Sequence, residues 1–248
     1  MIDIHCHILP GIDDGPSNMD KAVDMALAAV RSGTSRIIAT PHFKNGVFEV
    51  SKEMVSVSVE MFTRVLEEKR IALAVLPGAE IRISPDSCTL LDRGELLSLA
   101  GSRYYLFELP DIFIKQGIIE VLRQLRQREV IPIIAHPERN RTIQRHPEMI
   151  PEFIYENALF QVTGKSLTGE NGKLCFKIAR DMVKEGQAHF VASDGHNIRH
   201  RPPCLDDAVK VVKKVGGYKA VSTIFEENPA KIEGRCLAGN VVTGRRVG

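Results

Sequence analysis

Several common routes to function are excluded by features that this chain lacks. Its five cysteines form no C-x-x-C pair, and their odd number fits reduced thiols better than a disulfide framework. No apolar run is long enough to span a membrane, and the N-terminus lacks the basic, apolar and small-residue progression of a signal peptide. We therefore expect a soluble cytoplasmic protein without membrane insertion.

The charge of the chain is nearly balanced, which excludes a second class of function. Its 33 basic and 31 acidic residues leave a net charge of +2, so no electrostatic footprint for general nucleic-acid binding is present. Hydrophobic residues make up 44% of the chain, an ordinary globular composition that argues against disorder. At 248 residues, we expect one domain over positions 1–248, because α/β barrels commonly reach this length.

The sequence alternates between β-rich runs and helical patterns. The β-rich runs begin near positions 2, 35, 71, 104, 130, 159 and 188. Such a repeat is typical of a parallel sheet, and seven units predict a (β/α)7 TIM-like barrel of the α/β class. Helices are expected at 19–31, 51–69, 116–128, 147–157, 173–186, 205–215 and 219–227, followed by a glycine-containing tail. Residues 84–102 are expected to be irregular, with a helical turn near 88–93.

Histidines and carboxylates gather where these predicted strands end. His5 and His7 are two residues apart on an extended segment, so both rings are expected on one side of it. Chemistry in barrels of parallel strands collects at the carboxyl ends of the strands. The candidate metal ligands are His5, His7, Asp14, His42, Glu80, Glu108, His136, Asp194 and His196. Nine such side chains exceed what one ion needs, so we expect a cluster of two or three divalent ions.

Five motifs in this order resemble the polymerase-and-histidinol-phosphatase (PHP) superfamily of metal-dependent phosphoesterases. They are D-I-H-C-H near the N-terminus, T-P-H at 40–42, G-A-E at 78–80, A-H-P-E-R at 135–139 and S-D-G-H at 193–196. Within the superfamily, H-I-L-P-G-I-D-D-G and A-H-P-E-R-N most resemble the bacterial capsule and exopolysaccharide tyrosine phosphatases. The resemblance extends over nearly the whole chain and implies a distorted barrel of the PHP fold.

The resemblance also implies roles for individual residues. His5 and His7 would hold one ion with Asp194, and Glu80 would bridge to a second ion held by Glu108 and His136; Asp14, His42 and His196 would hold a third. The sequence alone leaves this partition open. Manganese is the expected metal, with iron or zinc as alternatives. Arg139 and Arg201 would bind the substrate phosphate, with Arg199 competing for the second place.

The function implied is a protein-tyrosine phosphatase that hydrolyses phosphotyrosine with a metal-activated water. Its expected partner is the tyrosine-rich tail of a bacterial tyrosine kinase that regulates capsule or exopolysaccharide synthesis. Segments 42–48 and 196–203 would form the rim of the site, and we expect unstructured acidic or polar peptides as substrates, without dependence on one sequence context. A homo-oligomer through the terminal helices is an open alternative.

Other functions compete with this interpretation. One is a histidinol-phosphate phosphatase or another small-molecule phosphomonoesterase, and another is a non-catalytic metal-binding regulatory module. A nuclease role ranks lower, given the balanced charge. A cysteine-based phosphatase is excluded because it needs a C-x5-R loop; Cys88 and Cys175 each have an arginine one position too near.

Several residues near the motifs are not expected to bind metal. Asp13 is interpreted as a turn former. Glu138 either orients Arg139 or a ligand histidine, or is an exposed loop charge. His146, His189 and His200 fit no motif and are expected to be ordinary surface or core residues.

Overall fold

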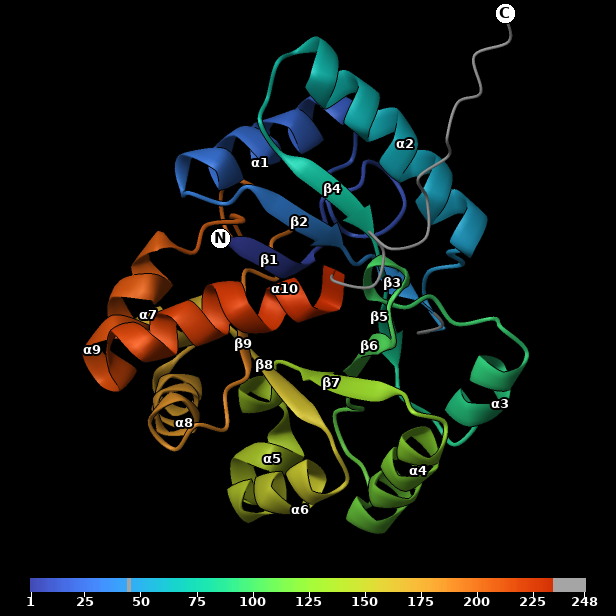
Figure 1. The fold of residues 1–248 in the computed structure, drawn as a ribbon, viewed down its shortest axis with the longest axis vertical. Helices are drawn as coiled ribbons and strands as arrows, with labels where there is room; N and C mark the ends of the chain where they lie inside the picture. Colours follow the sequence, from blue (N-terminus) through green and yellow to red (C-terminus); the bar gives the residue numbers. More distant parts are fainter. Residues whose placement is uncertain (44–45, 234–248) are drawn as a thin grey trace, which may run out of the picture.

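Parallel strands form the centre of the molecule in the computed structural model, which describes residues 1–43 and 46–233, and helices surround them (Figure 1). One sheet has the strand order β1-β2-β4, and the other has the order β3-β5-β6-β7-β8-β9. The strands are β1 (Ile2–Cys6), β2 (Arg36–Ala39), β3 (His42–Phe43), β4 (Ala74–Pro77), β5 (Glu80–Arg82), β6 (Tyr104–Glu108), β7 (Ile131–Ala135), β8 (Leu159–Thr163) and β9 (Phe190–Ala192).

The two sheets continue one another through two interrupted strands. Ala39 pairs with Pro77 and His42 pairs with Glu80, so β2–β3 and β4–β5 keep one register across their interruptions. A Cβ atom on Gly78, in the second interruption, would lie 2.7 Å from Ile38 Cγ2, which only glycine avoids. Counted this way, the described strands form seven units, as the sequence predicts.

Hydrogen bonds join the last strand unit to the first. The backbone N–H of Asp194, just after β9, donates to the His5 carbonyl at 2.8 Å. The N–H of His7 donates to the Gly195 carbonyl at 2.9 Å, beside a parallel bridge between Cys6 and Gly195. These bonds bring both edges of the strand array together at the carboxyl ends.

The interior of the strand array is apolar toward the amino ends of the strands. Its buried residues are Ile2, Ile4, Ile38, Leu99, Ala100, Leu106, Ile133, Ala135, Phe190, Ala192 and Ile232. Along a strand, every second side chain lies on the same face. Two residues beyond Leu106 comes Glu108, and two residues beyond Ala192 comes Asp194. For Glu108 and Asp194, the positions that fill the interior with apolar groups thus continue into candidate ligands at its carboxyl end.

Most helices cover the outside of the strands, whereas the last helix lies across the strand array in Figure 1 and contributes Ile232 to its apolar interior. The helices are α1 (Met19–Arg31), α2 (Lys52–Glu68), α3 (Ser87–Asp92), α4 (Lys115–Gln127), α5 (Arg141–Arg145), α6 (Ile150–Tyr155), α7 (Gly164–Thr168), α8 (Lys173–Lys184), α9 (Asp206–Ser222) and α10 (Asn228–Glu233). None of the helices in the described residues is long and apolar enough to cross a membrane.

Some predicted boundaries are wrong for local reasons. The third strand begins at Ala74 rather than at position 71. By contrast, the break predicted between the two C-terminal helices is present, because Gly217, where φ is 77°, is non-helical and divides α9 at that point. Helix α10 occupies 228–233, where a tail was expected, and the remainder of that tail, 234–248, lies outside the described residues.

The stability of the fold depends on the apolar interior, which yields a first prediction. Leu106 is completely buried there. We expect Leu106→Ala to lower the free energy of unfolding by about 2–5 kcal/mol, because it removes buried apolar contacts and leaves a cavity. Urea unfolding measures the change, with Val57→Ala on the exposed face of α2 as control. Equal losses in both variants would contradict this account of the interior.

Candidate metal centre

The structure brings the nine predicted ligands together at the carboxyl ends of the strands. Eight of them form three overlapping groups in which all ligand atoms lie within 4.8 Å of one another. The groups are His5, His7 and Glu80; Glu80, Glu108 and His136; and His7, Asp14, His42 and His196. The ninth, Asp194, places its Oδ1 3.4 Å from His5 Nε2 and 3.5 Å from His7 Nε2.

Glu80 lies at the centre of the first two groups. Its Oε1 is 2.8 Å from His136 Nε2, and its Oε2 is 2.9 Å from His42 Nδ1. The Nε2 atoms of His5 and His7 lie 3.5 and 3.4 Å from the same carboxylate. A carboxylate with both oxygens among histidine nitrogens has the placement required to bridge two ions.

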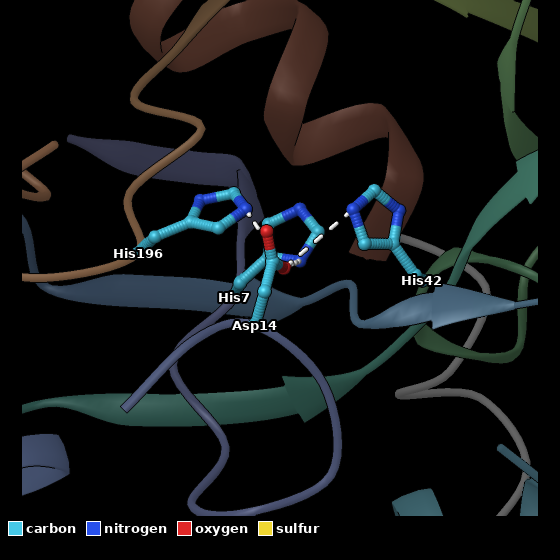
Figure 2. A group of neighbouring side chains, drawn as sticks. All are labelled: His7, Asp14, His42 and His196. Atoms are coloured by element: carbon cyan, nitrogen blue, oxygen red, sulfur yellow. Dashed lines mark ion pairs between the residues drawn. The ribbon is translucent and has the colours of Figure 1, made fainter. Parts of the chain in front are cut away.

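The third group lies toward the surface. Figure 2 shows the Asp14 carboxylate among the rings of His7, His42 and His196. Asp14 Oδ1 is 3.2 Å from His196 Nε2 and 3.6 Å from His42 Nε2. The Asp14 side chain is 47% exposed, whereas Asp194 is buried, so this group faces the solvent side of the cluster.

The histidines of the cluster are held by bonds to their other ring nitrogens. Gln161 Oε1 lies 2.8 Å from His5 Nδ1, and Asp13 Oδ2 lies 2.6 Å from His7 Nδ1. His196 Nδ1 lies 3.0 Å from the Asp194 carbonyl. Each bond leaves Nε2 directed at the cluster, which is how proteins orient metal-binding histidines.

The electrostatics of the cluster fit divalent cations. Burial by itself raises the pKa of Glu80, but the charge of His5 and the hydrogen bond with His136 outweigh it and hold that pKa well below its ordinary value. Burial likewise raises the pKa of Asp194, and the charge of His5 and the hydrogen bond with His7 reverse the shift. Within the described residues, buried Asp194 Oδ1 and His196 Nε2 have no hydrogen-bond partner in favourable geometry, although each lies close to a neighbouring candidate ligand, His7 at 3.5 Å and Asp14 at 3.2 Å. Ionised carboxylates and unpaired nitrogens are a donor set suited to manganese, iron or zinc.

Backbone conformation at the site is unusual at two of these residues. His136 has φ of 32° and Asp194 has φ of 51°, both in the left-handed region that non-glycine residues rarely adopt. Such conformations persist where the surrounding structure imposes them, and they concentrate at functional sites.

Two arginines lie beside the cluster and contact the same carboxylate oxygen. Arg139 Nη1 and Arg201 Nη2 both donate to Asp194 Oδ2, the latter at 2.6 Å. Their side chains are 35% and 34% exposed, so each guanidinium also reaches the surface. Arg199, the competing candidate, is exposed and lines a neighbouring cleft instead. A small cleft of about 90 Å³ lies beside Glu108, His136 and Arg139.

Comparison with known proteins assigns the family. The profile of the family described as "Capsular polysaccharide synthesis, CpsB/CapC" matches residues 1–233. This chain belongs to that family. It is 36% identical to the tyrosine-protein phosphatase YwqE of Bacillus subtilis (strain 168), over 96% of this chain and 99% of the relative. It is 35% identical to the putative tyrosine-protein phosphatase CapC of Staphylococcus aureus, over 98% of this chain and 95% of the relative.

Solved structures agree with this assignment. The chain matches a crystal structure from work on YwqE of Bacillus subtilis and CpsB of Streptococcus pneumoniae, described as unique metal-dependent tyrosine phosphatases. The TM-score is 0.90 at 37% identity, over 94% of each chain. A lactonase of Listeria monocytogenes matches with a TM-score of 0.57 at 14% identity, over 93% of each chain, which shows a shared fold alone. The resemblance to PHP-type capsule phosphatases is thereby confirmed.

Sequence reasoning missed two residues that support the ligands of this family member. Asp13 does form the predicted turn, since its Oδ1 accepts the Gly15 N–H at 2.9 Å, but its Oδ2 also holds His7 and accepts the His42 N–H at 3.1 Å. Gln161 was not singled out, because it lies on β8 outside every motif. The only signal for it was a polar residue at every second position of an apolar strand.

Glu138 is buried, so the interpretation of this residue as an exposed loop charge is wrong. The residue is completely buried, and its Oε1 accepts hydrogen bonds from Ser166 Oγ at 2.7 Å and the Thr163 N–H at 3.0 Å. These bonds fix the start of the segment that carries Arg139. Glu138 therefore anchors the segment before Arg139 to the end of β8 and to α7.

Thiol chemistry has no support at this site. Burial raises the pKa of the Cys6 thiol well above its ordinary value, and burial also raises the pKa values of Cys88, Cys175 and Cys204. A nucleophilic cysteine needs the opposite shift. Cys236 lies outside the described residues.

The contact between Asp13 and His7 gives a prediction about metal affinity. Asp13→Asn keeps a side chain able to form the turn but weakens the bond to His7 Nδ1. We expect the affinity for manganese to fall about tenfold to hundredfold, because such supporting bonds orient a ligand and raise its basicity. Calorimetric titration of the metal-free protein measures it, with exposed Asp207→Asn as the control. An unchanged affinity in Asp13→Asn would remove this residue from the metal centre.

Proposed function

We propose that this chain is a metal-dependent protein-tyrosine phosphatase that hydrolyses phosphotyrosine. The observation that carries the proposal is that Asp194 contacts both the ligand histidines His5 and His7 and the two arginines Arg139 and Arg201. Relatives that span almost the same length are named tyrosine-protein phosphatases, which supports this assignment over a small-molecule phosphatase or a non-catalytic module.

The proposed cofactor is a cluster of two or three divalent ions, with manganese first. Divalent ions in such a site lower the pKa of bound water and offset charge on phosphoryl oxygens. His5, His7 and Asp194 would hold one ion. Glu80, Glu108 and His136 would hold another, with the Glu80 carboxylate shared between the two.

The remaining ligands would hold a third ion. His7 belongs geometrically to this group as well, but its Nδ1 is bonded to Asp13 and its Nε2 faces Glu80. Asp14, His42 and His196 are therefore the side chains left for it. Because Asp14 is half exposed, this ion would be the one nearest to solvent.

Arg139 and Arg201 would bind the phosphate. A guanidinium presents a planar pair of N–H donors that matches two phosphate oxygens. Both arginines contact Asp194 from the solvent side, so a phosphate entering the cluster would find two preformed cationic groups. Preorganised charges of this kind stabilise the transition state without reorganisation.

The natural partner we propose is the tyrosine-rich tail of a bacterial tyrosine kinase in capsule or exopolysaccharide synthesis. The family description supports the capsule setting. We further propose a cytoplasmic location, which fits the unpaired and mostly buried cysteines of the described residues.

Metal content tests the cluster. We expect metal-loaded protein to contain more than one divalent ion per chain, and His136→Ala to reduce this number, because one of the three groups loses a ligand. Elemental analysis after removal of free metal measures it, with exposed His146→Ala as the matched control. A single ion or none in fully loaded protein would refute the cluster.

Mutation of the arginines tests the phosphate site. We expect Arg139→Ala and Arg201→Ala each to keep their metal. Each should lower kcat/KM for free phosphotyrosine by an amount that corresponds to a loss of about 2–4 kcal/mol in transition-state stabilisation. Lysine at either position should restore activity only partly. Exposed Arg145→Ala is the control. Full activity with retained metal, or a loss in Arg199→Ala alone, would overturn the assignment.

Substrate choice tests the activity itself. Under manganese, we expect kcat/KM to be highest for a phosphotyrosine peptide, low for the matching phosphoserine peptide and low for histidinol phosphate. The long side chain of phosphotyrosine would carry its phosphate into the cluster, whereas the shorter side chain of phosphoserine would not. A preference for histidinol phosphate would assign the chain to a small-molecule phosphatase.

A further inference from the structure

A cleft of about 540 Å³ opens directly beside the third ligand group. One wall is formed by residues 15–17 and the first turns of α1, and the other wall by residues 196–200. His196 belongs both to the cluster and to the cleft, and Gly15 follows Asp14 in the chain. The cleft is therefore continuous with the proposed reaction site, and its volume falls in the range of ligand sites.

The walls of the cleft are fixed by close backbone approaches. A Cβ atom on Gly15 would lie 2.3 Å from the His7 carbonyl oxygen, so only glycine allows the first wall to lie against β1. A Cβ atom on Gly195 would lie 2.9 Å from the Pro203 Cα. The cleft keeps its position relative to the ligands because both walls touch the ligand segments.

The second wall is a preformed loop. Asn197 Oδ1 accepts the backbone N–H groups of Arg199, His200 and Arg201 at 3.1, 2.7 and 3.3 Å. Lys165 Nζ donates to the His200 carbonyl. The loop thereby directs Arg201 toward Asp194 while Arg199 lines the cleft. A wall that is ordered before binding loses little conformational entropy when a ligand arrives.

The lining of the cleft combines an apolar floor with cationic edges. Pro16 and Met25 are buried beneath it, and Ile198, which is 50% exposed, forms an apolar part of the second wall. Lys21 and Arg199 are exposed, one on each side. Asp24 is the one carboxylate among the lining residues. Such a surface fits a large apolar side chain that is followed by an acidic one.

We propose that this cleft binds the residues that flank the phosphotyrosine of a peptide substrate, with a large apolar side chain over Ile198 and an acidic neighbour near Lys21 and Arg199. The proposal rests on the proposed function. It departs from the expectation that peptides are accepted without regard to sequence context. One wall of the cleft lies within the expected rim segment 196–203, and residues 15–25 form the other wall. In the other expected rim segment, 42–48, the ring of Phe48 stacks on His42 with 5.7 Å between the ring centroids, and positions 44 and 45 lie outside the described residues.

The experiment compares two phosphotyrosine peptides of equal length. The first carries leucine next to the phosphotyrosine and aspartate beyond it on both sides, and the second carries glycine and asparagine there. We expect the unsubstituted, manganese-loaded protein to show a kcat/KM about tenfold higher, or more, for the first peptide. Ile198→Asp and Lys21→Glu should each bring this ratio close to one, because they place negative charge in the apolar wall or at the cationic edge.

A matched control keeps the test specific. Tyr155 is 78% exposed and lies at the end of α6, four residues before β8 begins, so it belongs to the opposite end of the strands from the cluster. Tyr155→Asp should keep the full ratio. Circular dichroism and metal content of each variant establish that it is folded and loaded.

The outcomes separate this inference from the function on which it rests. A ratio near one in the unsubstituted protein, or an unchanged ratio in both cleft variants, would refute the cleft proposal while phosphotyrosine hydrolysis continues. Absence of turnover with both peptides and with free phosphotyrosine would instead refute the proposed function.

Discussion

Two buried carboxylates, Glu80 and Asp194, impose the constraint on which the rest of the site depends. A buried charge is tolerated only where opposite charges and hydrogen bonds compensate its desolvation. Here the compensation comes from the histidines of several strand ends and from Arg139 and Arg201. Because each carboxylate has several partners from different strand ends, these strand ends are linked to one another by electrostatics as well as by the sheet.

The division of the interior explains how such a polar cluster coexists with a stable fold. Toward the amino ends of the strands, residues such as Leu106 and Phe190 fill the interior with apolar side chains. Toward the carboxyl ends, the same inward positions carry Glu108 and Asp194. The apolar half supplies the burial that stabilises the array, and the polar half holds the candidate metal ligands beside the two arginines.

Local sequence patterns anticipated most of the regular structure. Helix α1 has the bounds that its periodicity predicts, and its N-cap is Asn18, whose side chain accepts the Lys21 N–H. The short helix α5 was missed, because its five residues include only one apolar position, Ile143, which gives no periodicity. Asn140 makes α5 possible by accepting two backbone N–H groups, and that residue is itself held by the Pro110 carbonyl.

The sequence by itself determined which side chains could bind metal. The alternation of strands and helices along the chain locates the strand ends, and the residues at those positions are histidines and carboxylates. Only the tertiary structure decided which nitrogen of each histidine faces the cluster, since the partners Asp13 and Gln161 come from a turn and from a distant strand. It also decided which of Arg201 and Arg199, two positions apart on one loop, contacts Asp194. Asn197 folds that loop so that only Arg201 contacts Asp194, and no periodicity in a sequence records the direction of a side chain on such a turn.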